Sequence, residues 1–176
     1  LKQHGLFLTF NAMSIDRIDK ELQEAAHVLE TFMNDASNLH AIRQAAGLLV
    51  SSLKLGGRIY SCGNGGSMSD AMHFAEELSG RFRDERKPIA AMAISDPGHI
   101  TCTANDYGYD RIFSRFIEAF GIKGDSLLAI STSGNSANII QAAKTAREKG
   151  MHIVALTGNS GGQLAQLCDV EIRVPH

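Results

Sequence analysis

The segment from Arg58 to Leu78 constrains the fold more than any other part of this 176-residue chain. It begins with an apolar, β-prone run, residues 58–62, and continues into Gly63-Asn64-Gly65-Gly66-Ser67, here called the glycine loop. A helical pattern follows, and we expect Ser67 or Ser69 to cap that helix by accepting a backbone N–H. A strand that meets a helix N-terminus through glycines predicts an anion site, because outward N–H groups and the helix dipole both favour negative charge.

The glycine loop differs from two familiar phosphate-binding motifs. Gly63 and Gly65 fit the first two glycines of G-x-G-x-x-G, but Met68 stands at the third position. No Gly-Lys-Ser/Thr follows, so the segment is not a P-loop either. A tight turn without a ligand therefore remains an alternative interpretation.

The helix after the glycine loop carries two distinct faces. At about 100° per residue, its core face contains Ala71, Phe74, Ala75 and Leu78. The other face carries Asp70, His73 and Glu77, with Arg81 beside it. An imidazole and a carboxylate four residues apart are neighbours and make half of a divalent metal site. Glu77 could equally be a general base, and a solvated polar pair is the third interpretation.

Composition excludes several classes of partner and location. The formal net charge of −2 gives no electrostatic basis for binding nucleic acid or a membrane. No apolar run is long enough to span a bilayer, and no signal peptide is evident. The three cysteines, an odd number without close spacing, fit a reducing compartment. We therefore predict a cytoplasmic protein.

The N-terminal part is predicted to contain a leader and two helices. Residues 1–12 look foreign to the fold, because Asn11-Ala12-Met13 resembles a cloning junction, and residues 13–176 are long enough for one domain with a proper core. Apolar residues recur at three or four from Ser14 onward and again from about Asn38 to Leu55. This pattern predicts a helical hairpin whose apolar faces meet either another subunit or the rest of the monomer.

The remaining sequence alternates buried strands with helices. Further strands are expected at 89–95, 126–130, 152–156 and 170–174, and helices at 112–120 and 137–149, with a turn at 96–98 and a short segment that ends at Gly108. This alternation predicts an α/β fold with a doubly wound, five-stranded parallel sheet, flavodoxin-like, preceded by the helical hairpin. Ligands of such sheets bind beyond the carboxyl ends of the strands.

The third expected strand runs into a segment rich in hydroxyl groups, here called the hydroxyl loop (residues 131–136). It carries Ser131, Thr132, Ser133 and Ser136. A helix cap needs one hydroxyl, so four of them at a helix N-terminus favour binding of a phosphate monoester without a fixed positive charge. Residues 157–162 are a weaker candidate and are predicted to form a turn.

The chain resembles the bacterial phosphoheptose isomerases, which are sugar isomerase (SIS) domain proteins. The resemblance extends over Met13–His176 and rests on residues 63–67, 70–78, 104–106, 131–136 and 171–176. It implies an aldose–ketose isomerase that converts sedoheptulose 7-phosphate to D-glycero-D-manno-heptose 7-phosphate through an enediol, the first step toward the ADP-heptose of lipopolysaccharide core. It also implies a cytoplasmic homotetramer with active sites between subunits and one zinc ion per subunit.

The resemblance also implies roles for individual residues. Glu77 matches the catalytic carboxylate, and His73 and Glu77 match zinc ligands, although a tight zinc ligand is not easily a free base. The implied substrate-binding residues are Asn64, Gly65, Gly66, Ser67, Glu77, Arg81, Asn105, Asp106, Ser131, Thr132, Ser133 and Ser136. Family members continue beyond the Arg-Val-Pro-His ending into a helix with a Gln and a His for the site, and this sequence stops at His176.

The alternative function belongs to a different class. Some SIS proteins are non-catalytic modules that bind sugar phosphates or associate with the bacterial replication initiator DnaA. Such a module needs the hydroxyl loop but no acid/base pair. The presence of both His73 and Glu77 therefore favours the isomerase.

Overall fold

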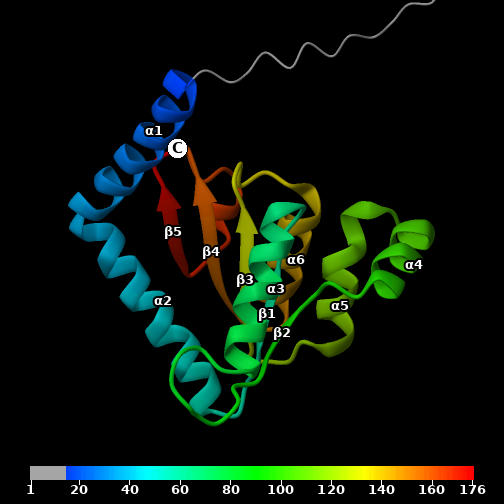
Figure 1. The fold of residues 1–176 in the computed structure, drawn as a ribbon. Helices are drawn as coiled ribbons and strands as arrows, with labels where there is room; N and C mark the ends of the chain where they lie inside the picture. The colour runs from blue at the N-terminus through cyan, green and yellow to red at the C-terminus, as the bar shows by residue number, and fades with distance from the viewer. Residues whose placement is uncertain (1–14) are drawn as a thin grey trace, which may run out of the picture.

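The computed structural model describes residues 15–176, so the predicted leader at 1–12 lies outside the described residues. The described chain forms one five-stranded, all-parallel sheet with helices on both faces, as predicted (Figure 1). Its strands lie in the order β2-β1-β3-β4-β5. They are β1 (Ile59–Cys62), β2 (Ala91–Ala93), β3 (Ser126–Ser131), β4 (His152–Gly158) and β5 (Val170–Val174).

Two hydrophobic cores cover the two faces of the sheet, and β3 contributes to both. Leu127 and Ala129 pack on the side of α5 (Ile112–Phe120) and α6 (Ala137–Glu148). Leu128 and Ile130 pack on the side of α2 (Ala36–Lys54) and α3 (Gly66–Ser79). All six residues of β3 are buried, as expected for a parallel strand that is covered on both sides.

The N-terminal helices form the predicted hairpin. The helix α1 (Ile15–Asn34) precedes α2, and Figure 1 shows the two as an open V beside the β5 edge of the sheet. Asp35 separates them and caps α2 by accepting the N–H of Ser37 at 2.8 Å. Whereas α2 buries Ala45 and Ser52, no residue of α1 is buried in the described chain. No helix in residues 15–176 combines the length and apolarity needed to cross a membrane.

One helix was not apparent from the sequence. The helix α4 (Pro97–Tyr107) occupies the segment for which the sequence predicted a turn and no helix. Its start is set locally, because Asp96 accepts the N–H of His99 at 2.7 Å and Pro97 lies in the first turn. Of its residues only Thr103 is buried, so α4 lacks the apolar stripe by which amphipathic helices are detected. Single 3₁₀ turns follow at η1 (Tyr109–Arg111) and η2 (Leu164–Gln166).

The fully buried residue Asp125 joins the amino ends of the central strands through its side chain and its backbone. One oxygen accepts the N–H of Arg58 at 2.8 Å, just before β1, and the other accepts the N–H of Ile122 at 3.0 Å. The carbonyl of Asp125 accepts the N–H of His152 at 2.8 Å, at the start of β4. One residue therefore aligns β1, β3 and β4.

Replacement of Asp125 by alanine should destabilise the protein strongly. The change leaves the N–H groups of Arg58 and Ile122 without their acceptor, and the free energy of unfolding should fall by roughly 2–5 kcal/mol in urea denaturation. Asp169→Ala is the matched control, because that half-exposed carboxylate accepts one N–H, from Ile153 at 2.7 Å. Equal losses for the two variants would contradict the role given to Asp125.

Candidate active site

The two predicted anion-binding loops lie side by side in the structure. The glycine loop follows β1 and the hydroxyl loop follows β3, and these strands are neighbours, with Cys62 opposite Ala129. The strand order also reverses between β1 and β3, which is the switch point where open α/β sheets bind their ligands. Burial raises the pKa of the Cys62 thiol beneath the loops to about 12, so this cysteine stays protonated.

The glycine loop closes onto α3 without a side-chain cap. Gly65, with φ 55°, is the N-cap residue, and Ser67 and Ser69 lie inside the first turn of the helix. The prediction that one of these serines caps α3 is therefore wrong. Gly63 allows the close turn, because a Cβ there would lie 2.4 Å from the carbonyl oxygen of Ser67. Glycine at both positions keeps side chains away from the end of β1.

The hydroxyl loop presents its side chains around the start of α6. The buried Ser131 hydroxyl donates to the Oγ of Ser136 at 3.2 Å, and the Oγ of Ser133 accepts the N–H of Asn135 at 3.2 Å. Ser136 is the N-cap residue of α6, yet its side chain makes no cap hydrogen bond within the described chain. Simple helix capping therefore does not account for these hydroxyl groups.

The predicted turn at residues 157–162, here called the support loop, packs against the backbone of the hydroxyl loop. The N–H of Gly158 donates to the carbonyl of Thr132 at 2.9 Å, and just beyond the support loop the N–H of Leu164 donates to the carbonyl of Gly134 at 3.0 Å. The two backbones approach so closely that a Cβ on Gly134 would lie 1.9 Å from the carbonyl oxygen of Gly161. This segment thus has a structural role in shaping the site.

Two residues that the sequence analysis did not select connect the site. Asn138, in the first turn of α6, exchanges side-chain hydrogen bonds with Asn64 at 2.8 and 2.9 Å. The hydroxyl of Tyr109 donates to the Oδ1 of Asn64 at 3.1 Å. The sequence offers one signal for Asn138, which is a polar residue directly before two apolar residues, Ile139 and Ile140. The structure shows all three to be buried in α6.

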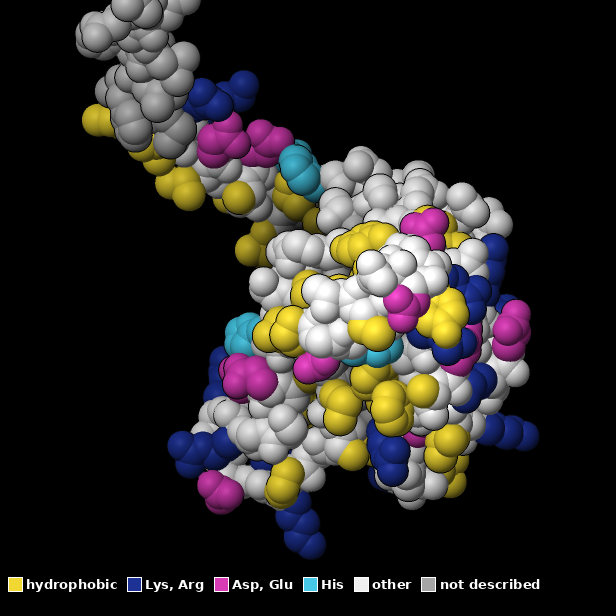
Figure 2. All heavy atoms as spheres, turned by 90° about the vertical axis from the view of Figure 1, so that its right-hand side faces the viewer, with side chains coloured by type: hydrophobic (Ala, Val, Ile, Leu, Met, Phe, Trp, Pro, Cys, Tyr) yellow, Lys and Arg dark blue, Asp and Glu magenta, His cyan; other side chains and the backbone are white. Residues whose placement is uncertain are grey.

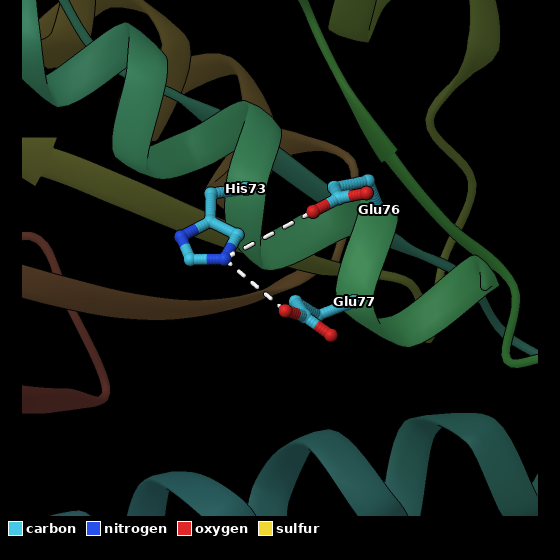
Figure 3. Close-up of side chains that lie close together, drawn as sticks. All are labelled: His73, Glu76 and Glu77. Carbon is cyan, nitrogen blue, oxygen red and sulfur yellow. Dashed lines mark hydrogen bonds and ion pairs between the residues drawn. The ribbon is translucent and has the colours of Figure 1, made fainter. Parts of the chain in front are cut away.

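His73 and Glu77 lie together on α3, as their spacing predicts, and Glu76 joins them (Figure 3). The Nε2 of His73 is 3.2 Å from the Oε1 of Glu77 and 3.9 Å from the Oε1 of Glu76. These ligand atoms lie within 4.8 Å of one another and offer one nitrogen and two oxygens, a donor set that suits zinc. His73 and Glu77 border a cleft of about 410 Å³ that Phe74 and Phe82 also line.

Three other predicted residues are not joined to the loops by hydrogen bonds within residues 15–176. Arg81 is exposed beyond the end of α3 and pairs with Glu85 at 3.4 Å. Asn105 and Asp106 are exposed in the last turns of α4, where the amide of Asn105 donates to the Asp106 carboxylate at 2.8 Å. Their roles as substrate contacts stay predictions.

Known proteins share both the fold and the sequence. A family model described as SIS domain matches residues 22–158. A curated phosphoheptose isomerase from Enterobacter sp. (strain 638) is 59% identical over 161 residues, which cover 92% of this chain and 84% of that protein. The same identity and coverage hold for the phosphoheptose isomerase of Salmonella dublin.

Solved structures of phosphoheptose isomerases also resemble this chain. The phosphoheptose isomerase of Neisseria gonorrhoeae has a TM-score of 0.85 and 41% identity, covering 92% of this chain and 85% of its own. For the enzyme of Francisella tularensis the TM-score is 0.88 and the identity 39%, covering 93% and 86%. The fold and its two loops are thus those of a SIS domain. Within that family, the chain belongs to the phosphoheptose isomerases.

Substitution of Gly134 by alanine should distort the hydroxyl loop. Its φ of 64° disfavours a side chain, and the added Cβ would collide with Gly161, so the free energy of unfolding should fall by roughly 1–3 kcal/mol or more. The control is Gly47→Ala, in the interior of α2 with nothing within 4 Å of the new Cβ, which should stabilise by about 1 kcal/mol. Thermal denaturation of both variants gives the comparison, and no loss for Gly134→Ala would contradict the tight contact.

Proposed function

We propose that this chain interconverts sedoheptulose 7-phosphate and D-glycero-D-manno-heptose 7-phosphate, an aldose–ketose isomerisation at the start of ADP-heptose synthesis for lipopolysaccharide core. The observation that carries the proposal is 59% identity to curated phosphoheptose isomerases across 92% of the chain. The paired loops at the β1/β3 switch point support it, because they offer an anion site at the place where this sheet topology binds ligands.

In this proposal the hydroxyl loop holds the phosphate of the sugar. Its hydroxyl groups and the first N–H groups of α6 supply donors, and the helix dipole adds a favourable potential. The binding residues are Ser131, Thr132, Ser133 and Ser136. The neighbouring glycine loop, with Asn64, Gly65, Gly66 and Ser67, faces the sugar next to that phosphate.

Isomerisation moves a proton between two adjacent carbons, so it needs a base beside the sugar, and Glu77 is the proposed base. The helix α3 leads away from the glycine loop along the sheet (Figure 1). At 1.5 Å per residue, Glu77 lies about 16 Å from Gly66 along the helix axis. Because this distance separates Glu77 from the loops of its own chain, we place Glu77 at a sugar whose phosphate is held by the loops of another subunit.

A divalent ion, zinc in this proposal, would be held by His73 and Glu77, with Glu76 as a nearby third donor. The nitrogen and oxygen donors and their mutual distances suit such an ion. When bound, it would supply a Lewis acid for the carbonyl oxygen of the sugar. The protein's own contribution there is to orient the donors: the guanidinium of Arg86 donates to the carbonyls of Leu78 and Glu77 and so holds the end of α3.

A shared site requires an oligomer, and α1 offers the surface for one. Apolar side chains recur along this helix, yet Leu22 is 66% exposed and Leu29 is 59% exposed. Figure 2 shows α1 projecting from the body of the molecule with hydrophobic side chains uncovered along it. Since an isolated amphipathic helix gains most of its stability from burying its apolar face, we propose that α1 packs against other copies in a homotetramer.

The non-catalytic alternative is less favoured. The relatives with 59% identity are named as isomerases, and His73 and Glu77 lie 3.2 Å apart beside a cleft. We further propose that the enzyme works in the cytoplasm. All three cysteines are free, which fits a reducing compartment.

Glu77→Gln should keep the fold and lower turnover of sedoheptulose 7-phosphate by a factor on the order of 10² to 10⁴, the usual contribution of a positioned base. The side chain points away from the core face of α3, so circular dichroism should not change. Glu148→Gln, which changes an exposed carboxylate in the last turn of α6, is the control and should leave turnover unchanged. Near-normal turnover of Glu77→Gln would remove Glu77 as the base, and no turnover by the wild type would contradict the proposed function.

Light scattering should give about four times the chain mass of 19.0 kDa. Leu22→Asp combined with Leu29→Asp places charges on the exposed apolar stripe of α1, and this double variant should dissociate. Because the sheet does not contain these residues, its circular dichroism should persist while activity is lost. A wild-type mass near 19.0 kDa at micromolar concentration would contradict both the tetramer and the shared site.

A further inference from the structure

The geometry points to Asn138 as a positioning residue that fixes the amide of Asn64 as a hydrogen-bond donor toward the sugar phosphate. This inference rests on the proposed function. Asn138 belongs to the helix that follows the hydroxyl loop, and Asn64 belongs to the glycine loop. Their side chains connect the glycine loop to the first turn of α6, with hydrogen bonds of 2.8 and 2.9 Å in opposite directions.

The orientation of the Asn138 amide follows from a backbone group. The N–H of Ile139 lies 2.9 Å from the Oδ1 of Asn138, and a backbone N–H can only donate. The atom that it meets must therefore be the oxygen of the amide and not its nitrogen. Asn138 is 2% exposed, so water does not compete for this choice. The nitrogen of Asn138 is thereby directed at Asn64.

The orientation of Asn64 follows in turn. Since the nitrogen of Asn138 donates, the atom of Asn64 that it meets at 2.8 Å is the oxygen. The hydroxyl of Tyr109 donates to the same oxygen at 3.1 Å. Both lone pairs of that oxygen are then occupied, and one N–H of Asn64 is used in the return bond to Asn138. Among the described residues, the second N–H of Asn64 is therefore the group that stays available to a ligand.

The chemical consequence is a choice of ligand atom. An amide held in this way offers the substrate a donor and no acceptor, which suits a phosphate or hydroxyl oxygen. A freely rotating asparagine would have to lose conformational freedom on binding before its nitrogen pointed steadily at the anion, and a fixed amide avoids that cost. Asn138 thus acts on the substrate through Asn64, and Tyr109 reinforces the same orientation from η1.

A double-mutant cycle tests this coupling. Calorimetry measures the dissociation constant of sedoheptulose 7-phosphate, in its equilibrium mixture with the aldose, for the wild type, Asn64→Ala, Asn138→Ala and the double variant. Each single variant should weaken binding at least tenfold, about 1.4 kcal/mol. The double variant should be no weaker than Asn64→Ala within about twofold, because Asn138 has nothing left to orient.

Two further variants guard against a purely structural effect. Tyr109→Phe removes one hydroxyl from an exposed side chain, so it should fold normally even if Asn138→Ala does not. It should weaken binding two- to fivefold in the wild type and have no effect in Asn64→Ala. Gln141→Ala alters an amide one turn later on α6 and should leave binding unchanged.

The outcomes separate this inference from the proposed function. If the wild type binds the sugar phosphate without converting it, the proposed isomerase activity is contradicted. The double-mutant cycle can then still measure the coupling between Asn64 and Asn138. The positioning role alone would be overturned by either of two results when the wild type binds normally. In the first, the losses of affinity in Asn64→Ala and Asn138→Ala multiply in the double variant. In the second, neither Asn138→Ala nor Tyr109→Phe loses affinity. Absence of binding by the wild type would overturn both.

Discussion

The parallel pairing of β1 with β3 is the constraint on which the rest of the structure depends. The register from Ile59 opposite Ser126 to Cys62 opposite Ala129 ends both strands at one edge and so places the glycine loop beside the hydroxyl loop. Asp125 fixes the opposite end of the same strands. A slip of one residue would exchange the faces of Leu127 and Leu128, whose neighbours lie in different cores, so this register is strongly specified.

The sheet could be predicted because parallel strands covered on both faces are nearly continuous apolar runs. The segment 126–130 is such a run, and β3 extends it by one residue. The core face of α3 could be predicted as well, since Ala71 and Ala75 are buried, as their period requires. The proximity of His73 and Glu77 follows from the same period.

The connections within the site could not be predicted, because they depend on residues far apart in the chain. Asn138 looks like an ordinary helical residue until the fold brings it to Asn64, 74 positions away. The start of α3 at Gly65 depends on backbone geometry, whereas the serines behind it suggested a cap. The helix α4 lacks an apolar stripe, so its capping by Asp96 was the one local signal available.

The strand order also determines when this protein can fold. Because β1 pairs with β2 and with β3, the central pair cannot form until residues 126–131 have left the ribosome. Before that point β1 has only the three-residue β2 as a partner, and a ribbon of two such short strands is marginal in water. The nascent chain therefore carries the apolar faces of α2 and α3 uncovered until β3 has emerged, and apolar surface exposed in this way is prone to aggregation. Long-range parallel pairing of this kind also makes folding slow.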